Sequence, residues 1–207
     1  MSRQPAILLL GPTGSGKSPL GKALEAAGWD GKRCAHFDFG AWLRRCGSYT
    51  PEAASFLNDD ELGVVRSALA GGALLEDEQF PIATKILEAF RSEQTLPPGD
   101  FIVLNGLPRH LGQAADLDAL IDLRFMVELA CDAETIRARI RLNSGGDRDG
   151  RVDDSLPEIE RKLAIYHERT LPLSEHYRAL GVPLRQFQVG VATSAEAILN
   201  RLNATVR

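Results

Sequence analysis

The segment Gly11–Ser18, which reads GPTGSGKS, constrains what this chain can fold into more than any other. It fits the pattern of a glycine, four residues, a second glycine, a lysine and a serine or threonine. The apolar run Pro5–Leu10 precedes it and predicts a short buried strand, and the segment SPLGKALEAAG predicts a helix after it. A glycine loop between a strand and a helix presents backbone N–H groups and a helix N-terminus to phosphates. The alternative is a glycine-rich turn without a ligand.

Each residue type in this loop has a chemical reason to be there. Glycines let the backbone turn its N–H groups inward around an anion. Lys17 can reach the β- and γ-phosphates of a nucleotide, and the hydroxyl of Ser18 can hold Mg²⁺. The residues predicted to bind the nucleotide phosphates are therefore Gly11, Pro12, Thr13, Gly14, Ser15, Gly16, Lys17 and Ser18.

Length, charge and cysteine content narrow the class of protein. The 207 residues suffice for one α/β domain with small insertions. A net charge of −4 gives no broad basic surface, so we expect neither nucleic acid nor a membrane as a partner. The N-terminus has only a short apolar run, which predicts no signal peptide and a cytoplasmic protein. The three cysteines are widely spaced and form neither a zinc pattern nor a disulfide framework.

Five apolar runs have the length of strands, and helical patterns separate them. This alternation is typical of crossover connections and of a parallel sheet that is buried on both faces. We therefore predict an α/β fold of three layers, a phosphate-loop fold with a five-stranded parallel sheet. The predicted strands are Ala6–Leu10, Arg33–Phe37, Phe101–Leu104, Arg124–Leu129 and Pro183–Val189.

Two segments depart from simple alternation and suggest how the domain is divided. Residues 38–98 are mostly helical in pattern, and residues 143–154 form a loop rich in glycine and charge. In a phosphate-loop protein the first could bind a second substrate and the second could be a lid. The alternatives are a helical insertion that serves stability and an ordinary surface loop. The core is then expected to comprise residues 1–37, 99–142 and 155–207.

The run Phe101–Leu120, FIVLNGLPRHLGQAADLDAL, carries the second strong signal. A buried strand ends at Asn105, at the edge of the sheet where sites of open α/β folds form. Arg109 follows a proline turn and is suited to grip a phosphate with two parallel hydrogen bonds, although it could be an ordinary surface residue. Gln113 has an amide that can pair with the edge of a base.

With these motifs in this order, the chain resembles the adenylate kinases, within the nucleoside monophosphate kinases. The likeness extends over nearly the whole chain. The lid is of the short form, without room for the four-cysteine zinc site of longer relatives. The matching segments are GPTGSGKS, HFDFGAWLRR, NGLPRHLGQAADLDAL, CDAETIRARI, and GRVDD with the following EIERKLAIYHERTLPLSEHYRALG.

The resemblance implies a role for each matching position. ATP with Mg²⁺ would occupy the phosphate loop, and Arg139 would stack its guanidinium plane on the donor adenine. Gln113 would read the acceptor base. The residues implied for binding the monophosphate are Asp38, Phe39, Gly40, Arg44, Gly106, Arg109 and Gln113. The catalytic cations implied are Lys17, Arg109, Arg151 and Lys162, of which Lys162 stands where the family usually has an arginine.

The chain also departs from the family pattern. Asn105 and Ala41 replace residues that are usually acidic, and Asn143 falls where a lid arginine is expected. Phe39 replaces a small hydroxyl residue near the acceptor base, where it could narrow the pocket, stack on a base or pack in the core. Arg148 could stand in for the missing lid arginine.

Asp38 could compensate for the acid that is absent at position 105. It ends the second predicted strand, so its carboxylate could help Ser18 to organise Mg²⁺, with Asn105 acting through water. The alternative is that Asp38 only caps the following helix.

These observations predict a monomeric enzyme that reversibly transfers the γ-phosphoryl group of ATP to a nucleoside monophosphate, most simply AMP, with Mg²⁺ as cofactor. Two alternatives stay open. Phe39 and Ala41 are compatible with a small-molecule kinase that has another acceptor. Asn105 and Asn143 are compatible with a catalytically weakened ATP-binding regulatory protein.

Overall fold

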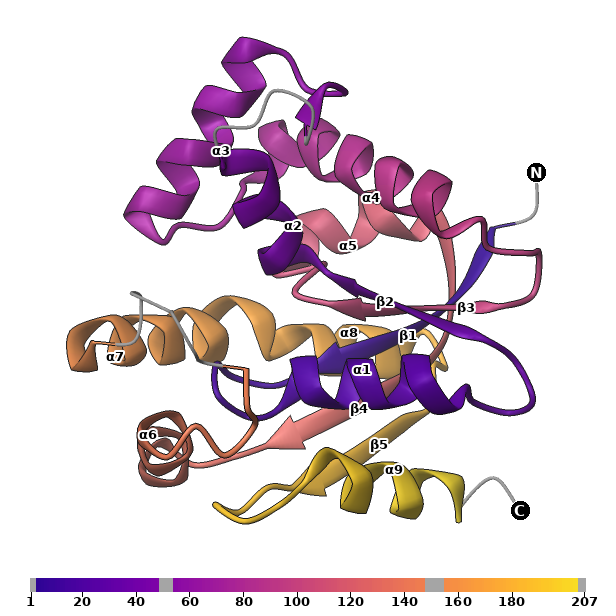
Figure 1. The fold of residues 1–207 in the computed structure, drawn as a ribbon, viewed down its shortest axis with the longest axis vertical. Helices are drawn as coiled ribbons and strands as arrows, with labels where there is room; N and C mark the ends of the chain where they lie inside the picture. The colour runs from indigo at the N-terminus through magenta and orange to yellow at the C-terminus, as the bar shows by residue number, and fades with distance from the viewer. Residues whose placement is uncertain (1–2, 49–53, 148–154, 205–207) are drawn as a thin grey trace.

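The computed structural model describes residues 3–48, 54–147 and 155–204. Its centre is a sheet of five parallel strands in the order β2-β3-β1-β4-β5, with helices on both faces (Figure 1). The predicted three-layer α/β phosphate-loop fold is therefore confirmed. The strands are β1 Gln4–Leu10, β2 Cys34–Asp38, β3 Phe101–Asn105, β4 Ile121–Ala130 and β5 Leu184–Gln188.

Helices connect all five strands. A 3₁₀ turn (η2) precedes α4, and one π-helical turn (η3) joins α7 to α8, so that these two helices and the turn form one long rod (Figure 1). The helical elements are α1 Lys17–Ala27, α2 Phe39–Gly47, α3 Asp59–Gly71, η2 Asp77–Gln79, α4 Phe80–Gln94, α5 Leu111–Asp118, α6 Ala133–Arg141, α7 Leu156–Ile165, η3 Tyr166–Thr170, α8 Pro172–Ala179 and α9 Ala195–Asn203.

Alternation along β1 explains the three layers. Ala6, Leu8 and Leu10 point into the core shared with α4, α5 and α8, whereas Ile7 and Leu9 point into the core beneath α1 and α9. Strand side chains alternate between the two faces of a sheet, so an uninterrupted apolar run must be covered on both faces. The continuous apolar sequence of β1 is thus the reason for its central position.

The register of the strands determines where a site can form. Asp38, the last residue of β2, pairs with Asn105 at the end of β3, and Asn105 pairs with Leu9 of β1. The phosphate loop begins directly after β1. Residues that follow three different strands therefore meet at one edge of the sheet, as in other open α/β sheets.

The segment between β2 and β3, residues 39–100, is called the insertion below. Its described residues form α2, α3, η2 and α4, which rise above the β2 side of the sheet (Figure 1). Phe37, Trp42 and Phe90 join this segment to the sheet through ring contacts, with centroids 5.0 Å apart for Phe37 and Phe90 and 6.0 Å apart for Trp42 and Phe90. In the part of the chain that the structure describes, no helix combines the length and apolar character needed to span a membrane.

Helix α1 packs closely on β2 because it has a glycine at the contact. A Cβ atom at Gly21 would overlap the imidazole ring of His36. A glycine in a helix interior costs about 0.5–1 kcal/mol relative to alanine. At this position the close approach of helix and strand compensates for that cost.

We predict that Gly21→Ala lowers the free energy of unfolding by about 1–3 kcal/mol, because the new methyl group overpacks the contact with His36. The matched control is Gly63→Ala in α3, where a Cβ would meet no atom within 4 Å. That change should raise stability by up to about 1 kcal/mol through helix propensity alone. Urea unfolding of both variants measures the difference, and equal stabilisation by the two substitutions would contradict the packing argument.

Candidate functional site

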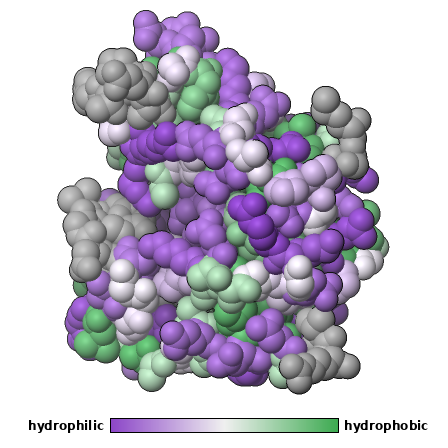
Figure 2. Space-filling view, turned by 45° about the vertical axis from the view of Figure 1, so that its right-hand side comes forward, coloured by the Kyte–Doolittle hydropathy of each residue, from purple (hydrophilic) through white to green (hydrophobic). Residues whose placement is uncertain are grey.

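A cleft of about 220 Å³ lies at the carboxyl edge of the sheet, between the phosphate loop and the insertion. Figure 2 shows a hollow with largely hydrophilic walls below the upper lobe of the molecule. The cleft brings together most of the residues that the sequence singled out. These are Gly11, Pro12, Thr13, Gly14, Gly16, Lys17, Ser18, Asp38, Gly40, Arg44, Asn105, Gly106, Arg109 and Lys162.

The backbone of the phosphate loop has a positive φ angle at three residues, a conformation that favours glycine. Gly11, Gly14 and Gly16 have φ angles of 147°, 78° and 103°. A Cβ at Gly11 would also lie 2.9 Å from the carbonyl oxygen of Leu129. Ser15, the remaining loop residue, is fully buried, and its hydroxyl has no hydrogen-bond partner among the described residues. A tight loop with an unsatisfied hydroxyl fits a phosphate ligand.

Lys17 lies at the start of α1, within this loop. Its Nζ donates to the carbonyl oxygens of Gly11 at 2.6 Å and Pro12 at 2.8 Å. The loop thus holds the ammonium group beside its own backbone N–H groups, where a phosphate would bind. A nucleotide phosphate could take over these hydrogen bonds with a much stronger charge-assisted interaction.

Ser18, Asp38 and Asn105 form one hydrogen-bonded group, with one residue from each of three neighbouring segments. The Ser18 hydroxyl donates to Asp38 Oδ2 at 2.6 Å. Asn105 Nδ2 lies 3.0 Å from both Ser18 Oγ and Asp38 Oδ2. Because a carboxylate only accepts, the amide nitrogen of Asn105 must face it. An aspartate at position 105 would place a second carboxylate against Asp38. Asparagine avoids this repulsion and donates a hydrogen bond to Asp38 instead.

Asp38 caps α2, which is one of the two roles that the sequence left open, and its other oxygen faces the phosphate loop; a role at Mg²⁺ stays a prediction. Its Oδ1 accepts the backbone N–H of Ala41 at 2.9 Å and caps α2, while Oδ2 faces Ser18. Burial acts to raise the pKa of this carboxyl group. The hydrogen bonds from Ser18 and Ala41 and the nearby charge of Arg44 outweigh burial and hold the pKa below its usual range. The group is therefore anionic at neutral pH.

His36 contacts Asn105 of this hydrogen-bonded group, a role that the sequence analysis missed. Its Nε2 lies 3.4 Å from Asn105 Nδ2. Burial lowers the pKa of His36, more strongly than Asp38 and Glu25 raise it. A neutral imidazole nitrogen can act as a third, more distant acceptor for the two N–H groups of Asn105, which face Ser18 and Asp38 at 3.0 Å.

Two arginines face the cleft from the acceptor side. Arg44 projects from α2 and Arg109 from the turn after β3. Among the described residues, neither guanidinium has a hydrogen bond or an ion pair. Burial lowers the pKa of Arg109, and the charge of Asp38 raises it less. Two cations that line the same cleft without an ion-pair partner suit an anionic ligand.

Apart from the buried Ser15, the structure places three described residues that were predicted for the site outside the cleft lining. Phe39 is only 3% exposed and packs against Phe37, with ring centroids 5.9 Å apart, so it belongs to the core. Gln113 has no exposed surface, and its amide is bonded to backbone groups. Neither side chain is available to an acceptor base in this conformation, because both are covered by protein.

The third is Arg139 of α6, which was expected to stack on the donor adenine. It is 4% exposed, and its guanidinium donates to carbonyl oxygens on both sides. One bond reaches Gly14 of the phosphate loop at 3.0 Å, and others reach Gly190 at 2.7 Å and Thr193 at 3.0 Å. Arg139 ties the loop to the segment after β5 here. Stacking on a base would require a different side-chain position and stays a prediction.

The expected lid can be described only at its start. Asp147 lines the cleft, and Asn143 has a φ of 46° in a turn after α6. Arg148 and Arg151 lie outside the described residues. The sequence analysis also missed Tyr166 and Thr170 of η3, which line the cleft. The wider π-helical turn that aims them there has no clear signal in the sequence.

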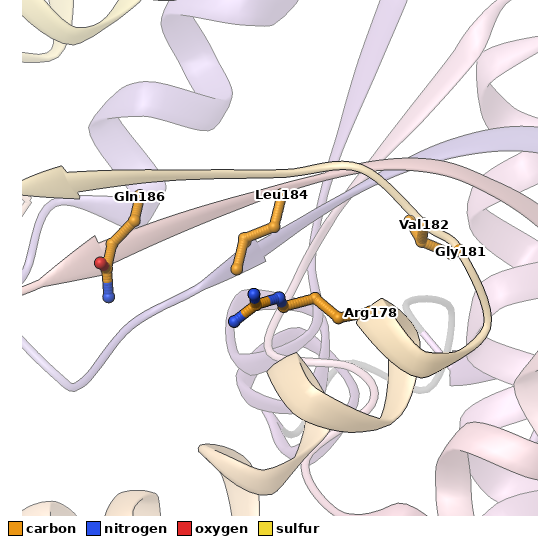
Figure 3. A pocket seen from close by; sticks show the side chains of 5 residues that line it. All are labelled: Arg178, Gly181, Val182, Leu184 and Gln186. Atoms are coloured by element: carbon orange, nitrogen blue, oxygen red, sulfur yellow. The ribbon is translucent and has the colours of Figure 1, made fainter.

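A second hollow, of about 380 Å³, lies between the end of α8 and the edge strand β5 (Figure 3). In this view Arg178 points toward Leu184, and Gln186 stands further along the strand. The hollow contains one cation and no residue of either motif. It therefore lacks both the phosphate loop and the pair of arginines that line the cleft.

Comparisons with known proteins agree with this geometry. An adenylate kinase of Parvibaculum lavamentivorans is 31% identical over 182 residues, which cover 84% of this chain and 80% of that protein. An adenylate kinase of Synechococcus sp. WH7803 is 29% identical, with 97% of each chain covered. The crystal structure of an unliganded sugar kinase from Janibacter sp. HTCC2649 superimposes with a TM-score of 0.53 at 14% identity, over 99% of this chain and 95% of that one, which supports the fold. No family model matches the chain.

We predict that Asp38→Asn lowers the free energy of unfolding by about 1–3 kcal/mol at pH 7, because hydrogen bonds to a charged acceptor are lost. Asparagine retains the ability to cap α2, so the change isolates the charge. The pKa of Asp38 is lowered by folding, so its stabilisation is complete above the ordinary aspartate pKa of about 4 and disappears as the pH falls below it.

Urea unfolding of the wild type and the variant across this pH range measures the effect. The gap in stability should close in acid. The exposed Asp30, changed to Asn, serves as the control and should show a gap of less than about 0.5 kcal/mol at every pH. A gap at position 38 that is independent of pH would show that the charge does not stabilise the fold.

Proposed function

Because this chain belongs to the adenylate kinase family, we propose that it transfers the γ-phosphoryl group of Mg²⁺-bound ATP to a nucleoside monophosphate, with AMP as the first acceptor to test. The chain is a phosphotransferase of the nucleotide kinase type. The proposal specifies ATP as the donor, AMP as an acceptor and Mg²⁺ as the metal ion.

One observation carries the proposal: a single cleft contains two separate groups of residues whose chemistry suits anions. The phosphate loop and Lys17 form one group, and Arg44 with Arg109 forms the other. A protein that only binds ATP needs the first group and has no use for the second. Two phosphorylated substrates brought end to end account for both.

Phosphoryl transfer depends more on the alignment of donor and acceptor than on covalent catalysis by the protein. Phosphoryl transfer proceeds through a loose transition state whose charge lies on the equatorial oxygens. Lys17 binds the donor phosphates, Arg44 and Arg109 hold the acceptor phosphate in line, and Lys162 adds a cation on the wall formed by α7. An acceptor phosphate is already anionic, so no general base is required.

The residues present fit a magnesium ion. Mg²⁺ prefers oxygen ligands and is usually bound by one or two carboxylates together with substrate phosphates. The Ser18 hydroxyl and the anionic Asp38 meet at 2.6 Å beside the loop, and these two residues would hold the ion. When bound, Mg²⁺ neutralises charge that develops between the β- and γ-phosphates. Asn105 would orient Asp38 and, through water, the ion.

Exclusion of water would favour transfer to the acceptor over hydrolysis. We assign this task to the insertion, as the monophosphate-binding part, and to residues 143–154, as a short lid that carries Arg151. Arg161 of α7 already reaches the carbonyl oxygen of Gly72 in the insertion at 2.9 Å. Contacts of this kind could hold the two walls of the cleft together around substrates.

Asp38 favours one alternative, an acceptor that reacts through a hydroxyl group. A carboxylate in the cleft could accept the proton of such a group. Its lowered pKa makes it a weak base, and two unpaired arginines call for an anionic acceptor. A phosphorylated acceptor is therefore the stronger proposal.

The test is an assay of ADP release from ATP and Mg²⁺ with AMP, GMP, CMP, UMP and a set of sugars and polyols. Turnover with a monophosphate supports the proposal. Turnover with an alcohol alone supports the alternative acceptor. Binding of ATP without turnover on any acceptor would refute transfer.

We predict that Arg44→Ala raises the KM for the acceptor about 10- to 100-fold, because one charge-assisted contact to its phosphate is lost, while the KM for ATP changes little. The matched control is the neighbouring Arg45→Ala. Arg45 pairs with Glu93 at 2.7 Å and lies over the Trp42 ring, away from the cleft. Steady-state kinetics with each substrate varied in turn measures the split, and equal effects of the two variants would contradict the assignment of Arg44.

A further inference from the structure

We propose that Arg169 is a positioning residue for the acceptor side of the cleft. Through its ion pair with Glu76 it holds the insertion where Arg44 and Arg109 can grip one acceptor phosphate together. This inference rests on the proposed function and deepens it, because it names a contact far from the phosphates on which the acceptor-binding arrangement depends.

Arg169 and Glu76 form an ion pair with two parallel hydrogen bonds. The two Nη atoms of Arg169 donate to the two carboxylate oxygens of Glu76 at 2.6 and 2.7 Å. These bonds lower the pKa of Glu76 and raise the pKa of Arg169, so both groups are charged at neutral pH. Exposed ion pairs usually contribute little, but two-pronged pairs of arginine and carboxylate are among the stronger ones.

The pair joins the insertion to the long rod formed by α7, η3 and α8. Glu76 lies between α3 and α4, directly before η2, whereas Arg169 belongs to the π-helical turn η3. A second arginine of the rod, Arg161, donates to the carbonyl oxygen of Gly72 at 2.9 Å. The segment 72–76 of the insertion is thus bonded to the rod near both of its ends.

The same π-helical turn also holds Arg109. The hydroxyl of Thr170, the residue after Arg169, donates to the carbonyl oxygen of Arg109 at 2.7 Å. Arg44, in contrast, belongs to α2 of the insertion. The position of Arg44 relative to Arg109 therefore depends on how the insertion is fixed to this turn, and Arg169 supplies that contact beside Thr170.

A loosened insertion would weaken acceptor binding without any change at the phosphate itself. A conformation in which Arg44 has moved away from Arg109 cannot bind an acceptor phosphate with both guanidinium groups. The apparent affinity falls in proportion to the population of the competent conformation. A pair that stabilises the competent arrangement therefore lowers the acceptor KM, whereas ATP binds mainly at the phosphate loop, which the pair does not contact.

Arg169→Gln and Glu76→Gln test this role in steady-state kinetics with the monophosphate that is turned over fastest. Each should raise the acceptor KM about 3- to 10-fold and leave kcat and the KM for ATP within about twofold of the wild type. The double variant should resemble either single variant, because all three lack the same interaction. Effects that multiply in the double variant would contradict a role through the pair.

The chain provides a matched control pair inside the insertion. Arg45 of α2 binds Glu93 of α4 through two hydrogen bonds of 2.9 and 2.7 Å. The side chains of the control pair are 44% and 45% exposed, against 32% and 49% for Arg169 and Glu76. Arg45→Gln and Glu93→Gln should leave the acceptor KM within about twofold. If the Arg169 and Glu76 variants change it no more than these controls, or lower it, the proposal is wrong.

Ionic strength separates the loss of an ion pair from a general structural defect. Salt screens exposed charges, so the wild type loses the benefit of the pair as the salt concentration rises. The ratio of the acceptor KM in Arg169→Gln to that in the wild type should fall toward one between about 0.05 M and about 1 M KCl. A ratio that does not change with salt would contradict the proposal.

Hydrogen exchange gives a readout that does not depend on turnover. The amides of Ala73 and Gln79 lie on either side of Glu76 and donate to the carbonyl oxygens of Ala68 and Glu76. Their exchange should accelerate in Arg169→Gln and stay unchanged in Arg45→Gln; unchanged exchange in Arg169→Gln would refute the positioning role. A wild-type protein that phosphorylates no monophosphate would refute the proposed function, and the exchange experiment would still decide whether Arg169 holds the insertion.

Discussion

The hydrogen bond from the Ser18 hydroxyl to the Asp38 carboxylate, at 2.6 Å, joins the two halves of the functional cleft. Ser18 belongs to the phosphate loop after β1, and Asp38 ends β2 and begins the insertion. This contact joins the phosphate loop to the start of α2, the helix that carries Arg44. Asn105 and His36 depend on it, because the orientation of the Asn105 amide is set by the anionic oxygen that it faces.

The parts of the fold that depend on local pattern were predictable. Apolar runs with intervening helices indicated the five strands; the structure extends them by one to three residues at several ends and omits Arg33, Pro183 and Val189. The phosphate loop was readable because its chemistry needs consecutive residues of fixed type. The cap at Asp38 was readable for the same reason, because the end of a strand and the start of a helix coincide there; its role at Mg²⁺ stays a prediction.

The parts that depend on distant backbone groups were not predictable. The Gln113 amide donates to the carbonyl oxygen of Leu75, 38 residues away in the sequence. The Thr170 hydroxyl donates to the carbonyl oxygen of Arg109, 61 residues away. Arg139 is held by the carbonyl oxygens of Gly190 and Thr193. No side-chain pattern marks a carbonyl as an acceptor, so the sequence could name the polar side chains and not their partners.

We propose that Asp38, at the end of β2, takes over part of the role of the acid that the family resemblance would place at the end of β3. An exchange of the two groups tests it: Asp38→Asn, Asn105→Asp and the double variant, with Mg²⁺-dependent turnover measured for each. Asp38→Asn should lose about 100-fold in kcat. Asn105→Asp should also lose activity, because two carboxylates about 3.0 Å apart repel each other. The double variant restores one acid and one amide and should return to within about tenfold of the wild type. Full activity of Asp38→Asn, or a double variant no better than Asp38→Asn, would contradict the account.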